Sequence, residues 1–162
     1  RALLAEVKAL PSPAPVGFVE RLRPLLDDPT DGRIKLYLTW RTLQLRSRWP
    51  DVFRDGEYVP LAATGAGAAH VVAYARRLGQ RSVVVLVPRL LTRMAGGRDE
   101  AASAPDWGDT RIELPPAGAG GWHDVLTGRG LTADADGALG VGEALSGCPV
   151  ALLVNDAALL AP

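Results

Sequence analysis

Between residues 29 and 48 the hydrophobic positions recur with the period of an α-helix, about 100° per residue, and they form two stripes on opposite sides of it. A helix at the surface of a small domain usually carries one apolar stripe, so two stripes predict a helix packed between two bodies. The alternative is a central helix within one small α+β domain. The two stripes are Ile34, Tyr37, Leu38 and Leu45 on one side and Leu36, Trp40 and Leu43 on the other.

Signals at both ends delimit this helix. Asp28 can cap its start, Pro29 suits the first helical position, and Asp31 places an acid in the first turn. At the other end, a residue before proline avoids the helical region, so the helix should stop at Trp49-Pro50. The pattern then predicts a turn at residues 53–56. Upstream, apolar spacing predicts two shorter helices, around residues 3–7 and 18–26, the second kinked or restarted at Pro24.

After residue 55 the pattern changes to short extended runs. Residues 70–76 and 82–87 should pair across a turn at Leu78-Gly79-Gln80, and the second run, continuously apolar, should be the most buried strand. Six or seven short strands separated by turn signals predict a β-sandwich. We therefore predict an α+β fold, with a helical segment at 1–54 and an antiparallel β-sandwich at 55–162. The remaining predicted strands are 57–61, 110–114, 122–127, 138–145 and 149–154.

Composition excludes several classes of protein. The formal net charge is zero, so there is no basic field of the kind that attracts nucleic acid or acidic membranes. No apolar run reaches the length needed to cross a bilayer. Cys148 is the single cysteine, which precludes an internal disulfide and favours a reducing compartment, the cytoplasm. The chain starts at Arg1 without a signal-peptide pattern, so we expect a piece of a longer polypeptide.

Seven segments, in order, closely resemble the C-terminal portion of the maltooligosyltrehalose synthases, a family of the α-amylase superfamily. The resemblance covers residues 17–154. Each segment alone is weak, but their order makes the match specific. They are residues 31–37 (DGRIKLY), 55–61 (DGEYVPL), 70–76 (HVVAYAR), 83–90 (VVVLVPRL), 107–110 (WGDT), 122–128 (WHDVLTG) and 149–153 (PVALL).

This resemblance implies an enzyme that converts the reducing-end α-1,4 linkage of a maltooligosaccharide into an α,α-1,1 linkage, an intramolecular transglucosylation without metal or organic cofactor. It implies retaining chemistry with two carboxyl groups about 5 Å apart. The family's catalytic carboxylates precede the resembling segments, so no catalytic residue is assigned here. A complete (β/α)8 barrel needs about 250 residues. We therefore expect residues 1–54 to be the last barrel helices, the missing N-terminal barrel to be the partner, and the isolated chain to be inactive.

Other chemical groupings in the sequence are weaker. Asp51, Asp55 and Glu57 are close together, but they lie at a helix-to-strand corner where acids are common turn residues. Cys148 with His123 or His70 could be a thiol nucleophile and its base, yet no helix start precedes Cys148 to lower its pKa. Two distant histidines and one cysteine do not predict a metal site.

Four tryptophans raise the possibility of sugar stacking. Trp40 and Trp49 belong to the helix and should be packing residues, whereas Trp107 and Trp122 lie beside glycine-rich connections and could contact glucan. Three functions remain open at this point. The first is the C-terminal fragment of a maltooligosyltrehalose synthase, structural rather than catalytic. The second is an autonomous starch-binding β-sandwich that uses Trp107 or Trp122. The third is a small hydrolase that uses Cys148.

Overall fold

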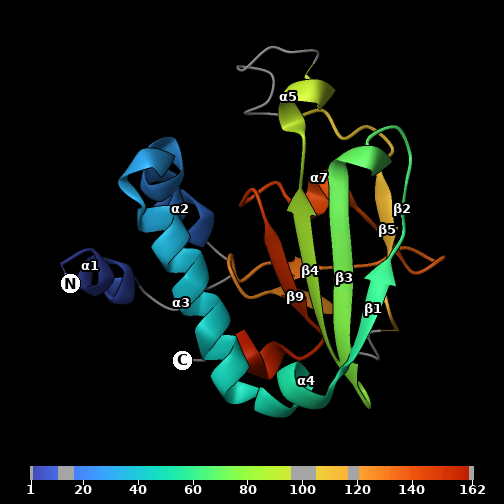
Figure 1. Cartoon of the computed structure of the whole chain (residues 1–162), viewed down its shortest axis with the longest axis horizontal. Coiled ribbons are helices and arrows are strands. Elements are labelled where there is room, and N and C mark those ends of the chain that lie inside the picture. The colour runs from blue at the N-terminus through green and yellow to red at the C-terminus, as the bar shows by residue number, and fades with distance from the viewer. Residues whose placement is uncertain (1, 11–16, 96–104, 117–120, 161–162) are drawn as a thin grey trace.

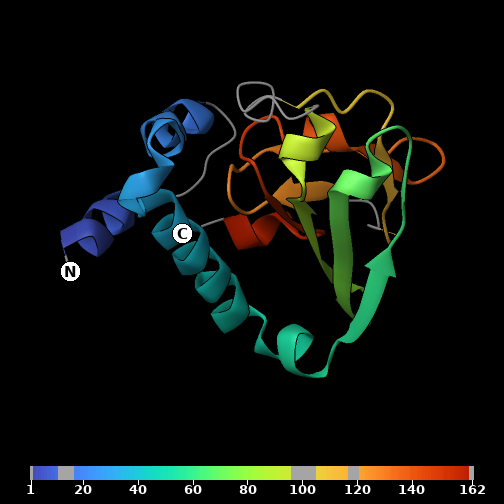
Figure 2. The ribbon, with the colours of Figure 1, turned by 45° about the horizontal axis from the view of Figure 1, so that its top comes forward.

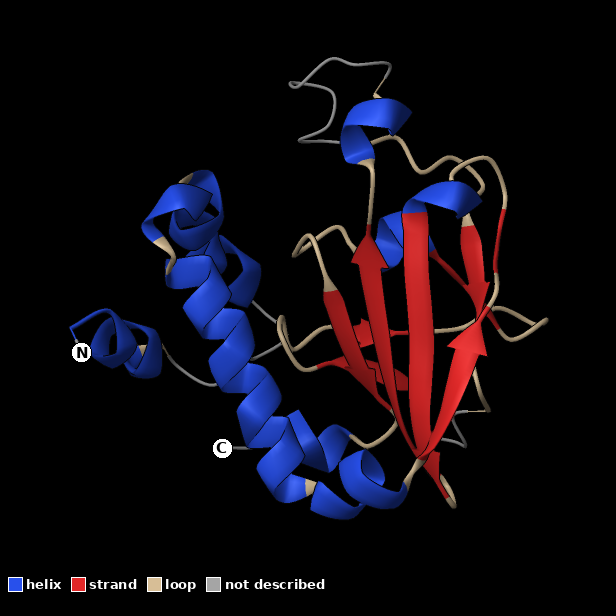
Figure 3. Cartoon of the chain, in the orientation of Figure 1, coloured by secondary structure: helices blue, strands red, loops and turns tan. Residues whose placement is uncertain are grey.

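The longer helices come first in the chain, and the strands follow with short helical turns between them (Figures 1 and 3). A computed structural model describes residues 2–10, 17–95, 105–116 and 121–160. Within these ranges an N-terminal group of helices precedes two antiparallel sheets, one of six strands and one of three. The predicted α+β class, with short helices followed by a β-sandwich, is confirmed.

The helices are α1 Ala2–Ala9, α2 Phe18–Asp27, the short 3-10 helix η1 Pro29–Asp31, α3 Arg33–Arg48 and α4 Pro50–Asp55. The predicted single helix from residue 29 is wrong in one respect: Gly32 has φ 80°, a left-handed conformation that separates η1 from α3. The Asp31 side chain accepts from the Arg33 N–H at 2.8 Å, which supports the new helix start. The predicted restart at Pro24 does not occur, because α2 continues through that residue, and a kink there stays a prediction.

The corner after α3 differs from the expected turn. Helix α3 ends at Arg48 with Trp49 as its C-cap, as Pro50 predicts, but Pro50 then occupies the first position of α4. Proline is well tolerated there because its missing N–H would have no helical partner. Most of the predicted turn at residues 53–56 therefore lies in α4. The strand β1 begins directly afterwards, at Glu57.

The larger sheet has the order β1-β3-β4-β9-β6-β7, and the pairs between neighbouring strands are antiparallel. The predicted hairpin is confirmed: Leu78 pairs with Arg81, and Gly79 at the first turn position has φ 59°, as a tight two-residue hairpin requires. The strands are β1 Glu57–Leu61, β3 Val71–Leu78, β4 Arg81–Pro88, β9 Ala151–Val154, β6 Trp122–Asp124 and β7 Gly130–Leu131.

The smaller sheet has the order β2-β5-β8. Four predicted strands are shorter than expected. The run 110–114 gives only Arg111–Glu113, and the run 149–154 gives only Ala151–Val154. The run 138–145 gives β8 and then turns into the helix α7, and the run 122–127 ends at Asp124. The strands are β2 Ala63–Thr64, β5 Arg111–Glu113 and β8 Ala138–Gly140, and the short helices are η2 Ala68–His70, α5 Leu91–Met94, α7 Val141–Ala144 and η4 Ala157–Leu160.

Two hydrophobic clusters divide the molecule into three layers. One cluster lies between the two sheets and includes Ala75, Leu86 and Leu153. The other lies between the helices and the opposite face of the larger sheet. Every residue of β9 is buried, whereas β4 is buried at four of its eight positions, so the most buried strand is β9 and not β4 as predicted. Its central place between β4 and β6 explains this burial.

The helices before residue 55 share their core with the sandwich. Leu22, Tyr37 and Leu45 belong to the same cluster as Val83 and Val154. The division into domains at 54/55 stays a prediction. The second stripe of α3 is partly covered within the chain, since α1 packs against α3 and Trp40 is half-buried, while Leu43 remains 57% exposed.

Candidate functional site

The polar centre of the molecule is the carboxylate of Asp124, at the end of β6, which is only 2% exposed. It accepts three hydrogen bonds: from the Leu126 N–H at 3.1 Å, the Leu152 N–H at 3.2 Å and the Thr127 hydroxyl at 2.6 Å. The Gly128 N–H also donates to the Asp124 carbonyl at 2.7 Å. These bonds close a turn over residues 125–128 and hold it against β9. They also explain why the strand stops at Asp124.

Burial and hydrogen bonding act on this carboxylate in opposite directions. Removal from water disfavours the charged form, and this effect raises the pKa of Asp124 above its ordinary value. The three hydrogen bonds and the charge of Arg129 oppose that rise. The group is therefore a hydrogen-bond acceptor enclosed in the core.

Helix α3 docks onto this turn through two buried polar side chains. The Tyr37 hydroxyl donates to the carbonyl of Leu126 at 2.5 Å, and the guanidinium of Arg41 donates to the carbonyl of Val125 through Nε at 3.3 Å and Nη2 at 3.0 Å. Desolvation raises the pKa of Tyr37 and lowers the pKa of Arg41. Because a buried carbonyl without a donor is costly, these contacts fix the helix in one position on the sandwich.

Two of the seven segments that resemble the family contain residues of this docking contact. Tyr37 ends the segment 31–37, and Asp124, Val125 and Leu126 lie in the segment 122–128, so the two segments meet at the α3 docking point. Sequence reasoning missed this centre. A signal was present, because Arg41 lies in line with Ile34, Tyr37 and Leu45 on an apolar stripe, and a charged residue there needs a buried partner.

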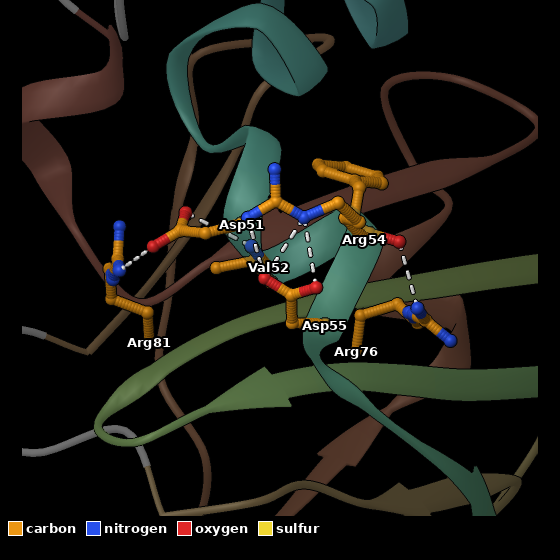
Figure 4. A network of polar contacts seen from close by, with 7 residues as sticks. Asp51, Val52, Arg54, Asp55, Arg76 and Arg81 are labelled. Carbon is orange, nitrogen blue, oxygen red and sulfur yellow. Dashed lines mark hydrogen bonds and ion pairs between the residues drawn. The ribbon is translucent and has the colours of Figure 1, made fainter.

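A second polar network joins α4 to the hairpin β3–β4 (Figure 4). Asp51 pairs with Arg81 and Asp55 with Arg54, while Arg76 donates to the carbonyl of Phe53 at 2.8 Å. The arginine partners lower the pKa of both Asp51 and Asp55. Carboxylates held in the charged form by arginine are poor proton donors. The contacts at this corner instead attach α4 to the hairpin.

The third residue of this acidic group, Glu57, is exposed on β1. Arg81 also lies over the Trp49 ring, 5.5 Å from its centroid, and Trp49 itself is buried. Trp49 therefore packs at the end of α3, in the role expected for it.

Cys148 lies in the cluster between helices and sheet, and burial raises the pKa of its thiol to about 12. His70 lies in η2, with Nδ1 3.3 Å from the Arg89 carbonyl oxygen, and His123 lies in β6. Among the described residues no cluster of His, Cys, Asp or Glu could hold a metal ion.

We expect Cys148 to resist alkylation in the folded chain. At pH 7 a thiol with a pKa near 12 is ionised in only about one molecule in 10⁵, and the side chain is 2% exposed. Iodoacetamide at pH 8 should modify it at least about 100-fold more slowly in the native protein than in urea. Rapid native labelling would instead support the hydrolase hypothesis.

The two tryptophans expected to lie free beside loops are in fact buried between the sheets. Trp122 is 1% exposed and Trp107 is 7% exposed. Trp107 borders a cavity of about 320 Å³ between α2 and residues 145–149, which is also lined by Arg23, Leu26 and Cys148. Glucan contact by Trp107 or Trp122 stays a prediction, and their burial gives it no support.

No family model matches the chain. A Mycobacterium tuberculosis protein named as a maltooligosyl trehalose synthase, found in the strains CDC 1551 and H37Rv, is 33% identical over 122 residues, 75% of this chain and 14% of the relative. A solved structure of a mutant maltooligosyltrehalose synthase from Arthrobacter ramosus matches with a TM-score of 0.62 and 31% identity, over 94% of this chain and 16% of that one.

The chain is homologous to part of the maltooligosyltrehalose synthases. The resemblance first seen in seven short segments is thereby confirmed, in sequence and in fold. The chain spans only 14% of the length of the curated relatives that it matches. None of the helices in the described part is long and apolar enough to span a bilayer.

Proposed function

We propose that this chain is the C-terminal part of a maltooligosyltrehalose synthase and that its role there is structural and non-catalytic. The observation that supports this most strongly is the difference in coverage: nearly all of this chain, 94%, aligns in space with 16% of the Arthrobacter enzyme. On this proposal the first helices are the last helices of a (β/α)8 barrel, and the sandwich that follows closes the polypeptide.

The whole enzyme would rearrange the reducing-end α-1,4 linkage of a maltooligosaccharide to an α,α-1,1 linkage, in the cytoplasm and without a metal or organic cofactor. Such chemistry uses a carboxylic acid whose pKa is raised and a second carboxylate on the other side of the glycosidic bond. Both would belong to the preceding barrel, which is the proposed partner of this chain.

Four acids of the described residues have shifted pKa values, and their surroundings fit a non-catalytic role. Hydrogen bonds from arginine partners lower the pKa of Asp31, Asp51 and Asp55. The pKa of Asp124 is raised, as a general acid requires, but its carboxylate is enclosed and all three of its hydrogen bonds are made to neighbouring turn and strand atoms. No sugar could reach it without unfolding the turn.

Complementation tests the proposal. The polypeptide that precedes this segment should convert maltopentaose poorly or not at all, because the last barrel helices would be missing. Co-expression with this chain should raise the trehalosyl-forming rate at least about tenfold, since the shared core positions those helices. The product is measured by its loss of reducing ends. Conversion of maltopentaose by this chain alone, or no rise with the two pieces together, would contradict the proposal.

A further inference from the structure

One face of the larger sheet carries a continuous apolar surface that the described part of the chain leaves open. Successive residues of a strand point to opposite faces, and the register aligns Pro60 with Tyr74, Tyr74 with Val85, and Val72 with Val87. These residues therefore lie side by side across three strands. The open sheet face consists of Tyr58, Pro60, Val72, Tyr74 and Val87, whereas Val85, on the same side of the sheet, already packs against the cluster beneath the helices.

The helices cover only part of this side of the sheet. In Figures 1 and 2 they lie beside β9 and below the hairpin, and no described element passes in front of β1 and β3. Tyr58 is 56% exposed and Val72 is 42% exposed. The intervening residues Ala73 and Ala75 point the other way and are buried between the sheets. The open face is thus a patch, and not scattered single residues.

The chemistry of the patch favours a protein surface over a sugar. The Tyr58 and Tyr74 rings lie 5.2 Å apart with a 32° angle between planes, and the remaining members are aliphatic. Contiguous apolar patches with aromatic residues mark protein interfaces. A sugar needs many hydrogen bonds, yet the nearby Arg76 already donates to the Phe53 carbonyl.

Strand addition at the neighbouring edge is a poor alternative. β1 is the edge strand of this sheet, and it carries Pro60, which has no N–H to donate to an added strand. The face of the sheet, and not its edge, is therefore the surface available for contact.

We propose that the open sheet face packs against the remaining part of the maltooligosyltrehalose synthase polypeptide. This inference rests on the proposed function, and it names the surface that makes the contact. The relatives are far longer than this chain, which matches 14% of the curated proteins and 16% of the Arthrobacter structure. Most of such a polypeptide therefore lies outside the chain and can supply an apolar partner surface.

Cysteine labelling, followed peptide by peptide by mass spectrometry, tests the contact. Val72→Cys and Tyr58→Cys are made separately, each in this chain and in the intact polypeptide. Both should react quickly with a maleimide in this chain, because positions 72 and 58 are exposed. In the intact polypeptide both should react at least about tenfold more slowly, since a buried interface excludes the reagent.

The matched control is Leu90→Cys, at an apolar position that is 50% exposed and lies outside the open sheet face. Its rate should differ less than about twofold between the two proteins. Equal rates at positions 72 and 58 in both proteins would overturn the inference. If the cysteines of this chain become protected as its concentration rises, the face binds a second copy instead. If they become protected only when maltoheptaose is added, the face binds a glucan. Either result would overturn the inference.

Failure of the proposed function is distinguishable from failure of this inference. The intact wild-type polypeptide is assayed with maltopentaose in parallel. If the intact polypeptide is active but the cysteines are not protected, only the inference is overturned. If the intact polypeptide forms no trehalosyl product, the proposed function is overturned. If one of the two cysteine variants fails to fold, the other still tests the contact, because Val72 and Tyr58 lie on different strands.

Discussion

Replacing Asp124 by alanine should destabilise the chain by about 2–6 kcal/mol. The substitution leaves the N–H groups of Leu126 and Leu152 buried without an acceptor, and each orphaned group costs about 1–3 kcal/mol. The turn that receives Tyr37 and Arg41 would lose its support at the same time. Urea unfolding, followed by tryptophan fluorescence, measures the change in the free energy of unfolding.

Asp124→Asn is the matched control. Its amide oxygen can accept both backbone N–H groups, and its NH₂ can donate to the Thr127 hydroxyl, which donates to Asp124 in the wild type. The asparagine variant should therefore retain most of the stability that alanine loses. An alanine variant within about 0.5 kcal/mol of the wild type would show that the Asp124 turn does not support the core.

The asparagine variant also isolates the pH dependence of Asp124. Burial raises the folded pKa of this carboxyl above 3.8, so the folded state holds its proton more tightly than the unfolded state. The contribution of the group to stability is fully present below pH 3.8 and is lost as the pH rises through the folded pKa. Asp31, Asp51 and Asp55 have the opposite effect, but they are unchanged in the variant.

The difference in unfolding free energy between Asp124→Asn and wild type should therefore move in favour of the variant as the pH rises from about 3 to 7. Unfolding curves at four or five pH values measure it. A difference that stays constant, or that moves toward the wild type, would mean that the hydrogen bonds outweigh burial and that the folded pKa is not raised.

Trp122→Ala is the second large effect, with an expected loss of about 3–5 kcal/mol. The indole is 1% exposed and packs in the cluster between the sheets, so removing it leaves a cavity in that cluster. A loss of that size lowers the melting temperature by about 2–4 °C per kcal/mol. Differential scanning calorimetry measures the shift.

Trp122→Phe provides the control and also addresses glucan contact. The Trp122 Nε1 group is buried without a hydrogen-bond partner among the described residues, so phenylalanine removes an unsatisfied donor while it keeps an aromatic ring. We expect a loss below about 1.5 kcal/mol. In affinity electrophoresis with soluble starch, Trp122→Phe should migrate as the wild type does. Retardation of the wild type that disappears in this variant would support the sugar-binding alternative.

Local patterns in the sequence determined the order of elements and several of their bounds. The strand Glu57–Leu61 and the hairpin Val71–Pro88 follow from periodicity and from Gly79 at the turn. Periodicity succeeds here because each of these elements is defined by neighbours in the chain. The order of seven short segments was likewise sufficient to identify the family of longer proteins to a part of which this chain is homologous.

Tertiary contacts decided the rest. The run 122–127 looks like one strand, but β6 stops at Asp124. The Asp124 carboxylate accepts a hydrogen bond from the N–H of Leu152, 28 residues later in the chain. The run 138–145 turns into α7, where Val141 and Ala144 enter the core between the sheets. In both cases a distant partner outweighs the local preference for an extended conformation.

The docking of α3 likewise depends partly on local sequence and partly on tertiary contacts. Its periodicity, set by residues three and four apart, predicted a helix with two apolar stripes. Which stripe would meet the sandwich depended on the carbonyls of Val125 and Leu126, which lie 84 and 89 residues away from Arg41 and Tyr37. Helical spacing is encoded locally, whereas the partner of a buried hydroxyl or guanidinium is set only when the chain folds and water is excluded from both groups.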